Sequence, residues 1–139
     1  MKRFFALIAI ICAVSFCSAQ NGSKAKTESA THNGAEIKFE KTVCDLGTVK
    51  LNQVVTDTYT FTNIGKKPLL LYNVVSACNC TKVEYDKKPV MPGKKGTIKV
   101  TFSATEPKDV GARSKRITVD SNAESDRVIL TLKANVVME

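Results

Sequence analysis

Two cysteines separated by one residue are the part of this sequence best suited to chemistry. They stand in the segment Ala77-Cys78-Asn79-Cys80-Thr81. In an extended chain, residues i and i+2 point the same way, so both sulfurs would lie on one face with their Cα atoms about 6.5 Å apart. That separation is at the outer limit of disulfide geometry. A Cys78–Cys80 disulfide therefore requires a bend at Asn79, and we expect it to be strained and more easily reduced than an ordinary disulfide.

The cysteine count leaves three interpretations open. Beyond residue 19 the chain has Cys44, Cys78 and Cys80, an odd number, so in an oxidising compartment at least one sulfur is unpaired, ligated or bonded to another molecule. The cysteines could form a structural disulfide, with Cys44 as a small core residue or a partner of one of the two. Cys78 and Cys80 could instead bind a soft ion such as copper(I), with Cys44, Met91 or Met138 as a further ligand, although methionines near strands more often belong to the core. They could also serve thiol–disulfide exchange.

Both functional interpretations lack supporting sequence features. A two-cysteine motif is a weak metal signal, because structural zinc sites use four ligands at characteristic spacings. Thiol oxidoreductases more usually carry Cys-x-x-Cys at the start of a helix, where the helix dipole lowers the thiol pKa. No helical periodicity surrounds Cys78 and Cys80.

No other constellation predicts catalysis. The one histidine, His32, lies in a polar segment without a nucleophile beside it, and no glycine-rich phosphate loop is present. The carboxylates are scattered over turns and polar faces: Asp45, Asp57, Glu84, Asp86, Asp109 and Asp120. We therefore expect no enzyme activity, no catalytic residues and no bound organic cofactor.

The first 19 residues have the pattern of a secretory signal peptide. Lys2 and Arg3 precede an apolar run over residues 4–16, and the small residues Ser18 and Ala19 follow. The run is shorter than the roughly 20 apolar residues of a membrane-spanning helix, and no later run is long enough. Cleavage after Ala19 would deliver the chain to the periplasm or the medium.

Lipid attachment at Cys17 is the alternative at this end of the chain. Cys17 closes the apolar run, but lipoprotein processing requires a small residue before the cysteine, and Phe16 stands there. The sequence thus favours cleavage after Ala19 over a lipoprotein.

The segment 20–35 has no large apolar side chain and is predicted to be a flexible tether. The formal net charge is +8, which could attract nucleic acid or an anionic surface. The lysines, however, form pairs at turns without interleaved aromatic residues, namely Lys66-Lys67, Lys87-Lys88 and Lys94-Lys95. We interpret them as a solvated rim and expect no nucleic-acid partner.

From residue 36 to residue 139 the apolar residues alternate with period two, which is typical of strands. Clusters of Gly, Pro, Asn and Ser divide this region. The expected strands lie around residues 36–43, 54–63, 69–76, 81–85, 96–104, 113–121 and 127–137. About seven short strands predict an all-β, immunoglobulin-like β-sandwich of antiparallel sheets. The run 69–75 is apolar on both faces and predicts the most central strand.

Several motifs together resemble the bacterial domain-of-unknown-function 1573 family of exported proteins. The motifs are Asp45-Leu46-Gly47-Thr48-Val49, Asn63-Ile64-Gly65-Lys66-Lys67-Pro68-Leu69, Cys78-Asn79-Cys80-Thr81, Met91-Pro92-Gly93-Lys94-Lys95-Gly96 and Lys115-Arg116-Ile117-Thr118-Val119-Asp120-Ser121-Asn122. The turn after Asn63 also suits Hydin-like and PapD-like domains. The family's usual motif is Cys-Gly-Cys-Thr, and Asn79 replaces its glycine. Asn tolerates left-handed backbone better than most residues.

The resemblance covers about residues 39–137 and implies an immunoglobulin-like sandwich in the cell envelope. It implies no activity, because the family has none established. We therefore expect a non-catalytic module that binds an envelope protein or surface component, with copper binding or thiol redox chemistry at Cys78 and Cys80 as the alternative.

Overall fold

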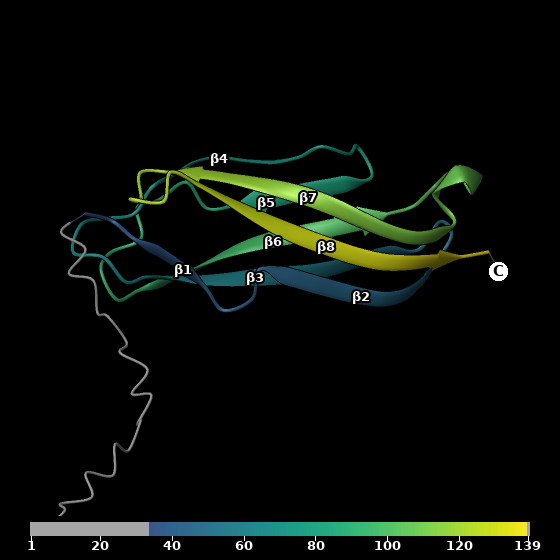
Figure 1. The fold of residues 1–139 in the computed structure, drawn as a ribbon, viewed down its shortest axis with the longest axis horizontal. Coiled ribbons are helices and arrows are strands. Elements are labelled where there is room, and N and C mark those ends of the chain that lie inside the picture. Colours follow the sequence, from purple (N-terminus) through teal and green to yellow (C-terminus); the bar gives the residue numbers. More distant parts are fainter. Residues whose placement is uncertain (1–33, 139) are drawn as a thin grey trace, which may run out of the picture.

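The computed structural model describes residues 34–138 as two four-stranded sheets packed face to face (Figure 1). The strands are β1 (Ile37–Phe39), β2 (Val43–Lys50), β3 (Val54–Asn63), β4 (Leu71–Ser76), β5 (Thr81–Tyr85), β6 (Lys95–Ser103), β7 (Gly111–Ser121) and β8 (Arg127–Val137). A 3-10 turn, η1 (Pro107–Asp109), connects β6 to β7. The predicted signal peptide, Cys17 and His32 lie outside the described residues.

The strand order makes one sheet β1-β3-β6-β5 and the other β2-β8-β7-β4. All pairings are antiparallel except β2 with β8, which run parallel. This is the two-sheet arrangement of immunoglobulin-like domains. The first segment of the chain contributes an edge strand to each sheet, β1 to one and β2 to the other. The all-β sandwich expected from the alternation is confirmed, with eight strands in place of about seven.

The sequence prediction was wrong about the strand that opens the domain. It placed one strand over residues 36–43, whereas the chain pairs with β3 over Ile37–Phe39 and then crosses to the other sheet as β2. The Asp45-Leu46-Gly47 segment is an irregularity inside β2. Gly47 has a φ of +66°, and its N–H donates to Asp45 Oδ1 at 2.8 Å. A residue in the left-handed region bends a strand without ending its pairing.

The run 69–75 was also misplaced, because β4 is an edge strand and not a central one. The register shifts between Leu71 and Asn73, so Leu71 and Val74 point into the core although they are three residues apart. Tyr72 and Val75 remain 65% and 45% exposed. The apolar run therefore has one buried face and one exposed face.

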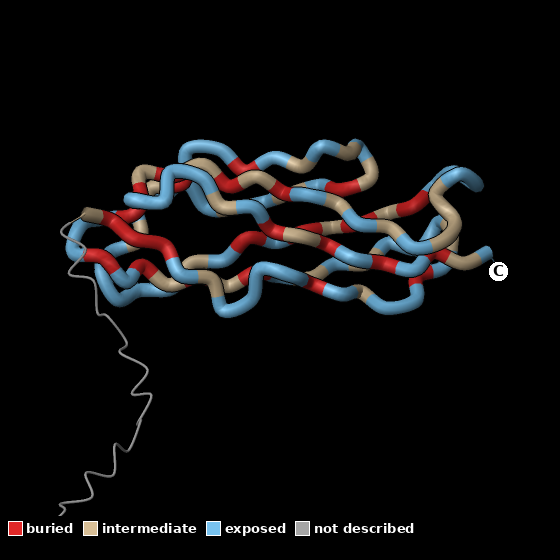
Figure 2. Tube along the Cα trace, viewed as in Figure 1, coloured by how far each residue is buried: buried red, intermediate tan, exposed pale blue. Residues whose placement is uncertain are grey.

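The core lies between the sheets and runs the length of the sandwich (Figure 2). Its largest fully buried side chains include Tyr59, Phe61 and Phe102. Tyr59 of β3 donates its hydroxyl hydrogen to the carbonyl oxygen of Thr131 in β8, across the sandwich, at 2.8 Å. Phe61 packs so tightly on Gly96 that a Cβ there would lie 2.3 Å from its ring. Any larger residue at position 96 would collide with the Phe61 ring, so glycine is required there.

Asn63, at the end of β3, is fully buried and joins three separate segments. Its Nδ2 donates to the carbonyl oxygens of Lys67 and Val90, both at 2.8 Å. Its Oδ1 accepts the N–H of Gly65 at 3.0 Å and that of Glu36 at 3.4 Å. One amide thus makes hydrogen bonds to four backbone groups, as buried polar groups require.

The chain entering the sandwich is packed from residue 34 onward. Ala35 is 3% exposed and forms a bridge with Ala123. Gly34 accepts the N–H of Lys66 at 2.8 Å. The structure thus places these two residues, which the sequence analysis assigned to the tether, with the domain. Within residues 34–138, no helix has the length and apolar character needed to cross a membrane.

We predict that Asn63→Asp lowers the free energy of unfolding by about 3 kcal/mol. The carboxyl group cannot donate to both carbonyls, and each unsatisfied buried polar group costs about 1–3 kcal/mol. Urea denaturation at neutral pH measures the loss. Asn135→Asp, the same change at an exposed position of β8, is the control and should shift the value by less than about 0.5 kcal/mol. Equal effects of the two substitutions would contradict this role.

Candidate functional site at the connection between β4 and β5

The connection from β4 to β5 carries both cysteines of the Cys-x-Cys motif and passes from one sheet to the other. Residues 77–80 span it, and a turn closes it because Thr81 N–H donates to the carbonyl oxygen of Cys78 at 3.1 Å. The carbonyl oxygen of Cys80 accepts the N–H of Ser103 in β6 at 2.9 Å. The connection is therefore anchored at its Cys80 side.

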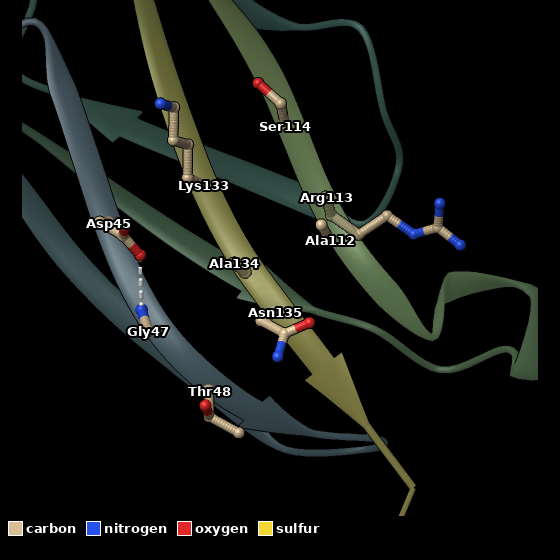
Figure 3. A pocket seen from close by; sticks show the side chains of 9 residues that line it. All are labelled: Asp45, Gly47, Thr48, Ala112, Arg113, Ser114, Lys133, Ala134 and Asn135. Atoms are coloured by element: carbon tan, nitrogen blue, oxygen red, sulfur yellow. Dashed lines mark hydrogen bonds between the residues drawn. The ribbon is translucent and has the colours of Figure 1, made fainter.

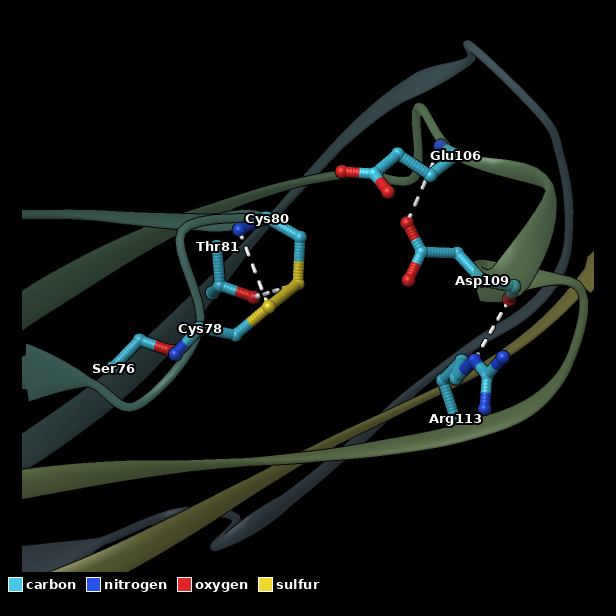
Figure 4. The surroundings of a disulfide bond; sticks show 7 residues. All are labelled: Ser76, Cys78, Cys80, Thr81, Glu106, Asp109 and Arg113. Atoms are coloured by element: carbon cyan, nitrogen blue, oxygen red, sulfur yellow. Dashed lines mark hydrogen bonds between the residues drawn. A yellow bond between two sulfur atoms is a disulfide. The ribbon is translucent and has the colours of Figure 1, made fainter.

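Cys78 and Cys80 form a disulfide, with their Cα atoms 5.2 Å apart (Figure 4). The bend that the sequence requires is present. Among the described non-glycine residues, only Asn52 has a positive φ, so Asn79 makes this bend without left-handed backbone. The replacement of the family's glycine by Asn79 is therefore compatible with the turn.

A hollow of about 620 Å³ opens beside the disulfide. Residues 77–80 form one wall, and the other walls come from Ser103, Thr105, Glu106, Lys108, Asp109 and Lys115. In Figure 4 the carboxylates of Glu106 and Asp109 lie on the far side of the disulfide from Ser76. The hollow thus places charges of both signs around two half-buried sulfurs.

The far wall of this hollow is held in place by the η1 turn. Arg113 donates through Nε to the carbonyl oxygen of Asp109 at 2.8 Å and through Nη2 to those of Lys108 and Val110. Lys108 pairs with Glu106 at 2.6 Å. The guanidinium group thus donates to carbonyl oxygens that have no backbone partner at the end of so short a helical turn.

Among the described residues Cys44 is the free cysteine, and it is buried in β2 beside Asp57 of β3. Its thiol donates to Asp57 Oδ2. Lys41 Nζ also donates to Asp57 Oδ2, at 2.8 Å, and lies 5.9 Å from the centre of the Tyr59 ring. The side chains of Lys41, Cys44, Asp57 and Tyr59 thus lie together at the edge of the sandwich.

The environment of Cys44 keeps its sulfur protonated. Burial and the hydrogen bond to Asp57 raise the pKa of the thiol to about 11. The hydrogen bonds from Cys44 and Lys41 lower the pKa of the Asp57 carboxyl to about 2. Since the thiolate is the nucleophile and the metal ligand, this cysteine is poorly suited to either role.

The structure separates Cys44 from the disulfide. Cys44 is on β2 and the disulfide follows β4, at opposite edges of the same sheet. Met91 and Met138 are 53% and 64% exposed and do not line the hollow, so neither belongs to the core. Residues 34–138 hold no group of three or more His, Cys, Asp or Glu side chains arranged for a metal ion. The structure therefore does not bring Cys44, Met91 or Met138 to Cys78 and Cys80 as a third ligand for a soft metal ion.

The sequence analysis placed Asp57 among the scattered carboxylates and missed both its hydrogen bond with Cys44 and the hollow. Asp57 occupies an inward position of β3, on the same face as Val55, Tyr59 and Phe61. A carboxylate on this otherwise apolar face was the sequence feature that could have revealed its role. The residues of the hollow come from the β4–β5 connection, the end of β6 with the loop after it, η1 and β7, which no local pattern brings together. The other carboxylates named from the sequence remain dispersed.

A second hollow, of about 490 Å³, lies on the β2-β8-β7 sheet where β2 is irregular (Figure 3). Its lining includes Asp45, Thr48, Ser114, Lys133 and Asn135. In Figure 3 these side chains stand apart, and the drawn hydrogen bond is the local one from Gly47 to Asp45. This surface has no converging group that would bind a ligand.

The fold and the site define an immunoglobulin-like β-sandwich of the PapD-like type. The chain belongs to the family described as proteins of unknown function, DUF1573, whose match covers residues 37–136. The resemblance inferred from the sequence is thus confirmed. No curated protein matches the chain.

Solved structures similar to this chain agree in fold. A protein of unknown function from Porphyromonas gingivalis matches with a TM-score of 0.64 at 17% identity, over 76% of this chain and 48% of that one. The chain thus spans about half the length of that protein. PapD-like domain 7 of human CEP192 matches at 0.63 and 7% identity, over 77% and 89% of the two chains. A chain of the CsuC–CsuE chaperone–tip adhesion subunit complex of Acinetobacter baumannii matches at 0.51 and 15%, over 73% and 52%.

We predict that the double variant Cys78→Ser/Cys80→Ser folds and loses only about 1–2 kcal/mol of stability. A disulfide that closes so short a loop removes little entropy from the unfolded chain. Urea denaturation of oxidised protein and variant measures the difference. Leu132→Ala, at a buried position in β8, is the reference and should cost about 2–5 kcal/mol. A double variant that fails to fold would make the disulfide a main structural support.

We predict that stability falls as the pH drops from about 4 to about 2, partly through Asp57. The unfolded chain takes up the Asp57 proton near pH 3.8 and the folded chain only near pH 2, so protons favour unfolding in this window. Denaturation curves across this range test it. In Asp57→Asn the slope should be smaller. An Asp57→Asn profile parallel to that of the unaltered protein would exclude the contribution.

Proposed function

We propose that this protein is a non-catalytic binding module of the cell envelope that accepts an extended segment of a partner protein along the edge of β4. The observation that carries the proposal is the chemistry of that edge. β4 contains no charged residue, proline or glycine, and it exposes Tyr72 and Val75. An edge strand with these properties is suited to pairing with another chain.

The other sheet edges carry features that oppose strand addition. β5 exposes Lys82 and Glu84, which are paired with each other at 3.4 Å. β2 is irregular between Asp45 and Thr48 and ends on Lys50. β1 covers only three residues. Charges, irregular pairing and short length are ways in which proteins protect edge strands from pairing with other chains. β4 has a register shift near Tyr72 but none of the other protective features.

A weak internal contact covers part of the β4 edge. The hydroxyl of Tyr85 in β5 donates to the carbonyl oxygen of Tyr72 at 3.4 Å. That distance is long for an O–H···O bond, so an incoming strand would displace it at small cost. The incoming backbone N–H would take the place of the tyrosine hydroxyl.

Exposed apolar side chains continue from this edge across the outer face of the sheet. Val75 of β4 lies opposite Thr118 of β7, which lies opposite Ile129 of β8. Val75 and Ile129 are each 45% exposed. A partner strand added to β4 would extend this row and contact Val75 first.

The location in the envelope rests on the sequence. The pattern of residues 1–19 is that of a secretory signal, and a disulfide is typical of an oxidising compartment. The structural likeness to a chain from a chaperone–adhesin complex, at 15% identity, is a likeness of fold. It supports the proposal only in that such sandwiches are able to take part in assemblies of this kind.

Val75→Lys tests the proposal. A lysine at this edge should abolish pairing, whereas Ile129→Lys, at a position of equal exposure on the same face but inside the sheet, should preserve it. A photo-crosslinking residue at Tyr72 in the exported protein reports the contact in whole cells. We expect a discrete crosslinked product that Val75→Lys removes and Ile129→Lys retains. Crosslinking that survives Val75→Lys would eliminate β4 as the site.

A further inference from the structure

We propose that the Cys78–Cys80 disulfide is a thiol–disulfide exchange site, with Cys78 as the cysteine that the partner attacks and Cys80 as the leaving cysteine. The proposal is independent of strand binding at β4. It rests on the unequal surroundings of the two sulfurs and on the hollow that gives access to them.

The two cysteines differ in how firmly the fold holds them. Cys80 packs against the core cluster, whereas Cys78 does not belong to the residues packed there. The carbonyl oxygen of Cys80 is bound to Ser103 in β6, and Thr81, the next residue, is buried. The hydrogen bonds of Cys78 are to residues close to it in sequence, and its own N–H donates to Ser76 Oγ at 3.4 Å. We therefore assign Cys78, the less firmly held of the two, as the cysteine that a partner attacks.

A backbone donor is already directed at the sulfur of Cys78. The N–H of Cys80 donates to Cys78 Sγ at 3.2 Å. When the disulfide is reduced, this hydrogen bond would favour the thiolate form of Cys78, because hydrogen bonding to the charged form stabilises it. Cys80 Sγ has a hydroxyl neighbour instead, Thr81 Oγ1 at 3.7 Å, a weaker contact.

The hollow provides room for a partner at this position. Its volume of about 620 Å³ adjoins both sulfurs, and Lys115 of β7 lines it with Lys108. Lys108 is paired with Glu106, whereas Lys115 makes no ion pair among the described residues. A cation near a sulfur favours the thiolate. The geometry thus accommodates a dithiol whose reactive sulfur enters the hollow.

The exchange is a two-electron transfer from a dithiol of the partner. The partner's thiolate attacks Cys78 Sγ, the Cys78–Cys80 bond breaks, and Cys80 leaves as a thiolate that takes up a proton. The partner's second thiol then attacks its own sulfur in the mixed disulfide and releases Cys78, which is protonated or held by the Cys80 N–H. The partner becomes a disulfide, and two electrons and two protons have passed to this chain.

Reduction of the exported protein by dithiothreitol under native conditions is the first test. Samples are acid-quenched and alkylated, and peptide mass spectrometry follows each cysteine separately. We expect Cys78 and Cys80 to become modified together while Cys44 stays protected and the far-ultraviolet circular dichroism is unchanged. Reduction that occurs only when denaturant unfolds the protein would overturn the proposal.

Single-cysteine variants test the assignment of roles. Both variants keep the buried Cys44 thiol. Beside it, Cys80→Ser leaves the Cys78 thiol, and Cys78→Ser leaves the Cys80 thiol. With the disulfide reagent 5,5′-dithiobis-(2-nitrobenzoate) at neutral pH, we expect Cys78 to react about tenfold faster than Cys80. Matching melting temperatures of the two variants confirm that both are folded. Equal rates, or faster reaction of Cys80, would overturn the assignment.

Discussion

The structure depends on the buried amide of Asn63. Four backbone groups from the incoming chain, the β3–β4 turn and the segment before β6 are satisfied by this one side chain. The carbonyl oxygen of Val90 also accepts the N–H of Leu69 at 2.9 Å. The other three groups depend on Asn63, because a buried polar group without a partner is costly. The side chain thus determines where β1 enters and where β3 ends, and the pairing of both with the rest of their sheet follows.

Asn63 holds one end of the sandwich, and the candidate site is at the other. At the site, order comes from local devices: the disulfide, the Cys80–Ser103 hydrogen bond and the Arg113 guanidinium that holds η1. These contacts involve few core residues. The fold is therefore held independently of the cysteines. The disulfide in the connection from β4 to β5 can be reduced or reformed while the core stays packed.

The sequence predicted the strands whose pairing follows from local alternation and missed features that depend on distant partners. The expected 54–63, 81–85 and 127–137 coincide with β3, β5 and β8, because one face of each is apolar with period two. The crossing between β1 and β2, the parallel β2–β8 pair and the edge position of β4 are decided by neighbours in space. In the same way, Cys78 and Cys80 were identified from their spacing, whereas the hollow, made from four separate segments, was not.

The parallel pairing of β2 with β8 has a mechanical consequence. β2 lies near the start of the described chain and β8 at its end, and both run in the same direction. Tension applied between the two ends of the domain would therefore pull these strands past each other along their length. In that direction the backbone hydrogen bonds over Val43–Asp45 and Thr48–Lys50 share the load, where an antiparallel terminal pair would open one bond at a time. A domain tethered at one end and pulled at the other would resist extension through this pair.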